Sequence, residues 1–411
     1  MYISQFRVRN YMIHQDTTID LHPLTVLVGP NGGGKSALFD SMLNFSLLSR
    51  GNLRQAFGPY PYSFRASLHH GASNVARIGF EVTMSRTHGD ADSLIYAIDY
   101  AQQGMAEDQP AFMIFNEKLT RMPGTTVLFD RSDADRYPLA RSLRLENDRS
   151  LFSAVRLAVG AGSTAGIDPL LEYLTQQISR FNKFRVDPTA LAAPNRLPEL
   201  SGDKESAVGP RLGYHGEDLA STLYYLAETQ AQALDVVRER VREVVPEFDD
   251  FDFNAVGTER IAFSIKYSDR RGAVPSVRLS SGMLNYLGLI VLVSTPNRPP
   301  VLMIEEAENG LTPQAVRSFY KAVRSLAFSE DDDQRSQVLI SSHSPFIICE
   351  AWNGEDRNFI HQVKVADGCA VVHKFSDVVA ELGTHLAKDK HGERSRLSLN
   401  HADAIMSGHL S

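Results

Sequence analysis

The most informative residues of the chain form a glycine-rich stretch that ends in a lysine and a serine: Gly29-Pro30-Asn31-Gly32-Gly33-Gly34-Lys35-Ser36. It fits the pattern G-x-x-x-x-G-K-[ST], in which glycines let backbone N–H groups turn towards a phosphate. Lys35 can reach the β- and γ-phosphates, and the Ser36 hydroxyl is a ligand for Mg²⁺. The apolar residues 24–28 predict a buried strand before this loop, and a helical pattern follows it. The stretch therefore predicts a nucleoside triphosphate site at a helix N-terminus.

A pair of acids follows a second apolar run. Residues 301–304 predict a parallel strand, and Glu305 and Glu306 come directly after it. In a nucleotide-binding sheet, an acid at this strand end holds Mg²⁺ through water, and a neighbouring acid activates the attacking water. We assign the first role to Glu305 and the second to Glu306. A surface pair that caps the next helix is the alternative, and the upstream phosphate loop makes it less favoured.

Two further turns bear polar residues that suit anion binding. Ser280, Ser281 and Gly282 precede an apolar helical segment, so their hydroxyl and N–H groups lie at a helix N-terminus. Alone, this turn predicts no more than a helix cap. His343 follows the apolar residues 338–341, where a side chain past the strand end can reach a γ-phosphate. A lone histidine is more often structural, but its place after the other motifs in order favours a functional role.

The remaining pattern describes the elements that must position these residues. Alternating apolar residues predict consecutive strands without intervening helices, which indicates an antiparallel sheet between 76 and 130. Residues 130–215 are rich in charge, Pro and Gly, and we expect connecting structure there. Apolar residues at three–four spacing predict one helix from Glu217 to Val245, and another from Pro313 to about Ala327.

Composition excludes several classes of protein. The chain has 411 residues, and 42 basic against 49 acidic side chains give a net charge of −7. Its hydrophobic content does not fit a disordered or collagen-like chain, and no apolar run reaches the roughly 18 residues of a membrane helix. The first residues do not fit a signal peptide. Because two cysteines cannot build a disulfide framework, we expect a cytoplasmic protein with no membrane partner.

Taken in order, these motifs resemble the heads of ABC-type ATPases, nearest to the SMC/RecF/OLD-like group and to AAA-type ATPases of bacterial anti-phage defence. The resemblance implies an α/β P-loop NTPase head with an antiparallel β subdomain and a helical insertion. It divides the chain into an N-terminal lobe (1–130), an insertion (131–250) and a C-terminal lobe (251–411). The sequence departs from the usual motifs, since Ser281 and Met283 replace Gly and Gln of the signature and Glu305 replaces an Asp.

The resemblance also implies ligands, roles and partners. The cofactors are ATP and Mg²⁺, with Ser36 and Glu305 on the metal and Lys35, Glu306 and His343 as catalytic residues. ATP would be sandwiched in a homodimer or higher homo-oligomer. No acidic strand motif of a TOPRIM nuclease follows His343, so a separate effector nuclease is expected, as in systems of the Septu or PARIS type. The residues expected to bind the nucleotide are Gly29, Pro30, Asn31, Gly32, Gly33, Gly34, Lys35, Ser36, Ala37, Ser280, Ser281 and Gly282.

Two other functions remain open from the sequence. A RecF-like or SMC-like DNA-maintenance clamp would make DNA a further partner, and it needs a basic surface. Arg238, Arg240 and Arg242 lie close together, but Glu239 and Glu243 interleave them, which is more typical of a solvated helix face. A transporter nucleotide-binding subunit is a third interpretation, and the antiparallel insertion and the atypical signature argue against it.

Overall fold

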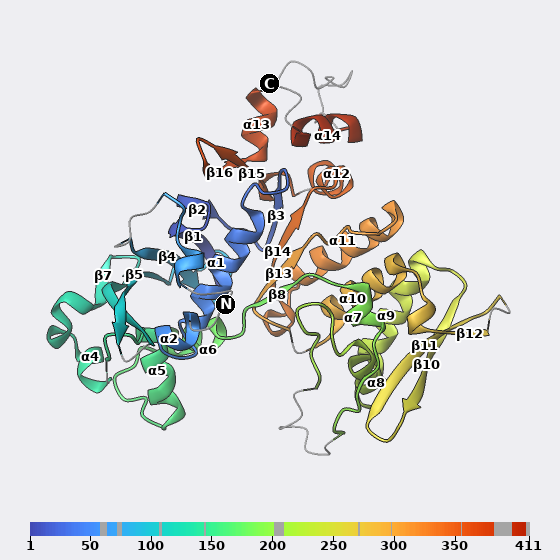
Figure 1. Cartoon of the computed structure of the whole chain (residues 1–411), viewed down its shortest axis with the longest axis horizontal. Helices are drawn as coiled ribbons and strands as arrows, with labels where there is room; N and C mark the ends of the chain where they lie inside the picture. Colours follow the sequence, from blue (N-terminus) through green and yellow to red (C-terminus); the bar gives the residue numbers. More distant parts are fainter. Residues whose placement is uncertain are drawn as a thin grey trace.

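The computed structural model describes residues 1–57, 64–71, 76–106, 109–143, 145–200, 209–269, 272–296, 298–354, 356–381 and 397–407. Three sheets organise these residues, two with six strands and one with four. Strands from the N-terminal end and from the last third of the chain lie side by side in the middle of the molecule (Figure 1). None of the helices in the described ranges combines the length and the apolar character that crossing a membrane requires.

The central sheet carries the sequence motifs. Its strand order is β16-β15-β3-β14-β13-β8, and all neighbouring pairs are parallel except β15 with β16. Apolar runs buried on both faces make these strands suited to a parallel sheet. The strands are β3 (Leu24–Val28), β8 (Asn182–Phe184), β13 (Val301–Glu305), β14 (Gln337–Ser342), β15 (Ile360–Ala366) and β16 (Cys369–Lys374).

The two faces of the central sheet belong to two separate cores. In β13, Val301 and Met303 pack into one core, while Leu302 and Ile304 pack into the other. This alternation follows from the two-residue period of a strand. Helix α1 (Lys35–Leu47) covers the first face, and α10 (Ser281–Ser294), α11 (Pro313–Ala327) and α12 (Pro345–Asn353) cover the second. The expected helix from Pro313 to Ala327 is confirmed.

An antiparallel sheet packs against α1 on the first face. Its strand order is β2-β1-β4-β5-β6-β7, which confirms the predicted antiparallel sheet and adds the two N-terminal strands to it. Phe45 of α1 is fully buried among the rings of Phe6, Phe80, Tyr96 and Phe152. The strands are β1 (Tyr2–Tyr11), β2 (His14–Asp20), β4 (Ile78–Ser85), β5 (Ser93–Ala106), β6 (Gln109–Met122) and β7 (Thr126–Asp130).

The segment expected to be connecting structure contains several elements of its own. After η1 (Arg131–Arg136), short helices lead into β8, which becomes the edge strand of the central sheet. No apolar run marks this strand, because β8 has only three residues and one of them is Lys183. The short helices of the N-terminal half are α2 (Leu53–Phe57), α3 (Phe64–Ser67), α4 (Pro138–Ser142), α5 (Leu151–Gly160), α6 (Pro169–Ile178) and α7 (Pro188–Ala192).

The prediction of one helix from Glu217 to Val245 is wrong. The structure has two helices, α8 (Leu219–Thr229) and α9 (Ala231–Val244), separated by Gln230 with φ −142° and ψ 56°. Gln230, the polar break in the apolar stripe, is the residue at which the helical backbone is interrupted.

A third sheet packs beside these helices and was not predicted. It pairs β10 (Phe248–Val256), β11 (Arg260–Tyr267) and β12 (Gly272–Pro275), with β9 (Asn195–Arg196) on β11. It lies next to α8 and α9, on the side of the molecule away from α1 (Figure 1). Near the C-terminus, α13 (Phe375–Glu381) contacts β15, and α14 (Leu399–Ser407) contacts α12.

One buried histidine makes the stability of the fold depend on pH. His361 on β15 is 2% exposed, and its Nε2 has no hydrogen-bond partner in the described structure. Burial, together with the nearby His22, lowers the pKa of His361 from its ordinary 6.5 to about 4. Between pH 6.5 and about 4, His361 is therefore protonated in the unfolded chain but not in the folded chain. Because the unfolded state binds the extra proton, a fall in pH favours unfolding.

We predict that His361→Gln weakens this acid dependence. For the wild-type chain, the linkage contributes a loss of about 1.4 kcal/mol in the free energy of unfolding for each pH unit between 6.5 and about 4. Urea denaturation at pH 7 and pH 5 should therefore show a smaller drop for the variant. The exposed His70→Gln serves as the control and should follow wild type. Equal drops for wild type and His361→Gln would contradict the linkage.

Candidate functional site

Three of the predicted motifs meet at one edge of the central sheet. Strands β3, β14 and β13 are adjacent, and their registers pair Val28 with Ser342 and Ser341 with Glu305. The phosphate loop (residues 29–36), the acids Glu305 and Glu306 at the end of β13, and the histidine turn (residues 341–345) therefore lie side by side at this edge. The carboxyl edge of a parallel sheet is where such folds bind ligands. We call this place the carboxyl edge.

The phosphate loop has a backbone that requires glycine. Gly29, Gly32 and Gly34 have φ values of 145°, 76° and 107°, which side-chain-bearing residues rarely adopt. A Cβ on Gly29 would lie 2.1 Å from the carbonyl oxygen of Val363 on β15, so the loop is pressed against the next strand. Helix α1 begins at Lys35 directly after the loop, as predicted. Its first N–H groups are therefore directed at the space that the loop surrounds.

The lysine of this loop is buried and contacts its own loop. Lys35 is 8% exposed, and its Nζ donates hydrogen bonds of 2.7 Å and 2.9 Å to the carbonyl oxygens of Gly29 and Pro30. Burial lowers the pKa of Lys35, while the charges of Glu306, Glu308 and Glu305 oppose that shift. The two hydrogen bonds hold the ammonium within the phosphate loop.

Glu305 is the buried end of a charge cluster that the sequence motifs did not indicate. Its side chain is 3% exposed, and its Oε2 accepts a 3.0 Å hydrogen bond from the Tyr214 hydroxyl. The same oxygen lies 3.3 Å from Nζ of Lys183, which also forms a 2.6 Å ion pair with Asp40 of α1. Lys183 belongs to β8, so the edge strand brings a cation to the end of β13. We call Asp40, Lys183, Tyr214 and Glu305 the lysine cluster.

The electrostatics of the lysine cluster follow from its burial. Burial opposes the charge on Lys183, but Asp40 and Glu305 outweigh it and raise the pKa of the lysine. Burial also raises the pKa of Asp40, against the pull of Lys183. It raises the pKa of Tyr214 to about 12, with Glu305 adding to the effect and Lys183 opposing it. Lys183 therefore remains a cation and Tyr214 remains a hydroxyl donor at neutral pH.

Glu306 lies at a strained position and is held by two donors. Its φ is +48°, an unusual value for a residue with a side chain, and its N–H donates to the Ser341 carbonyl at 3.0 Å. Its Oε2 accepts hydrogen bonds of 2.8 Å from Arg185 and 2.9 Å from Asn309. The turn after β13 thus directs the second acid away from Lys183 and towards a different cation.

The serine turn (residues 279–283) lies on the other side of the central sheet from the phosphate loop. The Ser280 hydroxyl accepts a hydrogen bond from the Met283 N–H and caps α10, and Ser280 and Ser281 are exposed. Helix α10 packs into one core of the molecule and α1 into the other, and Figure 1 shows them apart. Within one chain, the structure therefore does not bring Ser280, Ser281 and Gly282 to Lys35.

The serine turn is nevertheless connected to Glu306. A Cβ on Gly282 would lie 2.3 Å from the Gly310 carbonyl oxygen, so the two turns touch through their backbones. Asn285 of α10 donates a 2.9 Å hydrogen bond to the Asn309 carbonyl. Because the Asn309 side chain donates to Glu306, an unbroken series of contacts runs from α10 to this acid.

The residues at the carboxyl edge fit a magnesium nucleotide. Glu305 has a buried oxygen, Oε1, that lacks a hydrogen-bond partner in the described structure, and such an atom suits a cation or its bound water. Nowhere in the described ranges do three or more His, Cys, Asp and Glu side chains form a metal cage. Mg²⁺ in nucleotide sites needs only one or two protein ligands, because phosphates and water supply the rest. Ser36 and Glu305 meet that requirement.

The arginines considered for DNA binding are engaged within the protein. Arg238 forms 2.8 Å ion pairs with Asp235 and Asp250, and Arg240 lies 3.3 Å from Glu243. Arg242 donates a 2.7 Å hydrogen bond to the Asp249 carbonyl. Since these guanidinium groups already have partners, α9 does not present a free basic face.

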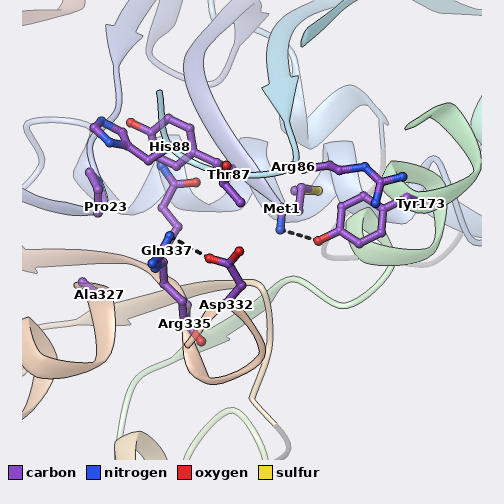
Figure 2. A pocket seen from close by; sticks show the side chains of 12 residues that line it. Met1, Pro23, Arg86, Thr87, His88, Tyr173, Ala327, Asp332, Arg335 and Gln337 are labelled. Carbon is purple, nitrogen blue, oxygen red and sulfur yellow. Dashed lines mark hydrogen bonds and ion pairs between the residues drawn. The ribbon is translucent and has the colours of Figure 1, made fainter. Parts of the chain in front are cut away.

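A separate cavity of about 250 Å³ lies at the opposite edge of the central sheet (Figure 2). Its lining includes Pro23 and Gln337, which lie at the amino ends of β3 and β14. In it the Met1 amino group donates a 2.8 Å hydrogen bond to the Tyr173 hydroxyl. Burial lowers the pKa of this amino group to about 6. Because the motifs lie at the carboxyl ends of the same strands, this cavity is not part of the nucleotide site.

The chain is similar to known proteins both in its sequence family and in its fold. The family model described as "AAA domain, putative AbiEii toxin, Type IV TA system" matches residues 24–349. The SMC head bound to the C-winged helix domain of ScpA has a TM-score of 0.52 and 11% identity, over 91% of this chain and 98% of that one. The SMC head domain from Thermotoga maritima has a TM-score of 0.44 and 13% identity, over 91% of this chain and 99% of that one. A search of curated proteins gives no match.

We predict that Lys183→Met destabilises the protein strongly. The substitution removes the cation but leaves Asp40 and Glu305 close together and largely buried, which costs roughly 3–5 kcal/mol in the free energy of unfolding. Lys266→Met is the matched control, because its ion pair with Asp252 is exposed and should contribute less than about 1 kcal/mol. Urea denaturation followed by circular dichroism measures both. Similar losses in the two variants would refute the structural role of the lysine cluster.

Proposed function

The chain belongs to this AAA ATPase family, whose model matches most of its length, and we propose that it binds and hydrolyses ATP as a nucleotide-driven dimerisation switch. The observation that carries the proposal is the adjacency of β3, β14 and β13, which collects the phosphate loop, two acids and a histidine at one edge. Cation, base and phosphate cradle are the parts that phosphoryl transfer to water requires.

Each group at the carboxyl edge has a distinct proposed role. Lys35 and the loop N–H groups bind the β- and γ-phosphates, and Glu306 orients the attacking water and accepts its proton. His343 contacts the γ-phosphate. Ser36 and Glu305 would hold Mg²⁺, which supplies positive charge against the phosphate oxygens when it is bound.

Two of these side chains are held by partners within the protein. Lys35 is bonded to its own loop, and Glu306 is bonded to Arg185 and Asn309. We propose that ATP displaces these partners when it binds, and that hydrolysis is regulated through this exchange.

The serine turn provides the reason for proposing a dimer. Ser280 and Ser281 are exposed but lie across the central sheet from the phosphate loop of the same chain. In a two-fold dimer, the serine turn of one copy can face the nucleotide of the other, so that two ATP molecules lie between two heads. ATP then stabilises the closed dimer because both copies bind it.

The output of the switch is proposed to lie in a second protein. The family description refers to a toxin of a toxin–antitoxin system, which supports a role in bacterial conflict. We propose that the chain is the ATPase and sensor component of an anti-phage system and controls a separate effector nuclease. The internally paired arginines of α9 give no support to a DNA clamp.

We predict that Glu306→Gln blocks hydrolysis but not nucleotide binding. Loss of the base should lower kcat by roughly a hundredfold or more, while the affinity for ATP changes little. With hydrolysis blocked, ATP should hold the variant as a dimer of twice the monomer mass in light scattering. Lys35→Ala is the contrasting variant and should remain a monomer. Undiminished hydrolysis by Glu306→Gln would overturn the assignment of the base.

We predict that two inactive variants restore each other when they are mixed. Ser280→Asp keeps an acceptor for the Met283 N–H but places a negative charge against the partner's γ-phosphate. Lys35→Ala disables the phosphate loop. A mixed dimer has one site with both defects and one intact site, so an equal mixture should recover about a quarter of wild-type ATPase activity. No recovery, with both variants folded and mixed dimers detected, would rule out shared sites.

A further inference from the structure

A third acid lies at the carboxyl edge, and neither the sequence motifs nor the proposed reaction uses it. Glu308 follows Glu306 by two residues, and its side chain is 7% exposed. One oxygen, Oε1, accepts hydrogen bonds of 2.9 Å from the Ser342 hydroxyl and 2.8 Å from the His343 N–H. The same oxygen lies 3.3 Å from Nδ1 of the His343 ring.

We propose that Glu308 is a positioning residue for His343, which it holds through Nδ1–H so that Nε2 is left free to face the γ-phosphate. The proposal rests on the proposed ATPase function, because only that reaction gives Nε2 a partner. The two nitrogens of an imidazole are distinct, and a hydrogen bond to one of them determines which nitrogen bears the proton in the neutral ring. A carboxylate at Nδ1 therefore fixes both the tautomer and the direction of the ring.

The exposure of the two side chains supports this role. The His343 side chain is 44% exposed, so packing alone does not determine the direction of its ring. Glu308 is buried beneath it and is itself held by the turn through Ser342 and the His343 backbone. A rigid buried acceptor below an exposed ring is the arrangement that preorganises a catalytic side chain.

The second oxygen of Glu308 separates this residue from an ordinary structural acid. Oε2 is buried and has no hydrogen-bond partner in the part of the chain that the structure describes. A buried carboxylate with an unsatisfied oxygen is costly. A smaller polar group could accept the two hydrogen bonds that Oε1 receives from the Ser342 hydroxyl and the His343 N–H. Glu305 and Glu306 differ, because each lies against a cation, Lys183 or Arg185. Glu308 lies against the histidine.

A double-mutant cycle tests whether Glu308 acts through His343. Glu308→Leu removes the acceptor, and we expect kcat to fall about tenfold to a hundredfold while the Kd for ATP changes less than about twofold. Glu308→Gln keeps an acceptor oxygen and should stay within about threefold of wild type. In a His343→Leu background, Glu308→Leu should have no further effect. A further fall of the same size there would overturn the proposal, since Glu308 would then act independently of the ring.

A second measurement reads the ring directly and does not need turnover. The ¹⁵N NMR signals of the His343 ring, identified by their loss in His343→Leu, should show the proton on Nδ1 in the nucleotide-free protein. Glu308→Leu should shift the proton to Nε2 or to a mixture. Glu350→Gln is the control, because Glu350 pairs with Arg317 on the outside of α12 and should change neither kcat nor the tautomer. A proton on Nε2 in the wild-type protein would overturn the proposal.

The two measurements separate this inference from the proposed function. If the wild-type protein fails to hydrolyse ATP but its His343 ring has the proton on Nδ1, the ATPase assignment fails and the contact with Glu308 stands. If the protein hydrolyses ATP but Glu308→Leu has wild-type kcat, the ATPase assignment stands and the role of Glu308 fails.

Discussion

The parallel pairing of β3, β14 and β13 is the constraint on which the rest of the structure depends. These strands come from residues 24–28, 337–342 and 301–305, so the chain must close long loops to place them together. Burial of alternate residues in two different cores fixes their register, because a one-residue slip would exchange the two faces. Once the register is fixed, the ends of the strands coincide, and the groups that follow them share one small space.

The residues of this space illustrate what a sequence can and cannot predict. The phosphate loop, the strands before it and before Glu305, and the helix Pro313–Ala327 follow from local patterns, and the structure has them at the expected positions. The roles of Glu306, His343 and the serine turn stay predictions, because they depend on contacts with phosphate and with a second copy of the chain, which local patterns do not specify. The break at Gln230 is a change in the backbone angles of one residue, which the spacing of apolar residues on either side does not reveal.

The lysine cluster was beyond sequence analysis for a different reason. Lys183 lies on a three-residue strand with no apolar run, and Tyr214 lies in a loop, so neither has a local signature. Their importance arises only when β8 joins the edge of the sheet and brings them to Glu305. The same holds for Glu308, which belongs to none of the sequence motifs, although the fold buries it beside the histidine turn. Long-range contacts determine which charged residues come together around this site.

The contacts from Asn285 through Asn309 to Glu306 have a consequence for how two nucleotide sites could influence each other. The serine turn begins the helix that carries Asn285, and that turn lies across the sheet from the nucleotide of its own chain. In the proposed dimer, the nucleotide bound by one copy would contact the serine turn of the other copy. The contacts through Asn285 and Asn309 would then link that nucleotide to Glu306 of the second copy. Binding of a nucleotide at one site would then tune the rate of hydrolysis at the other, while each site keeps an activity of its own.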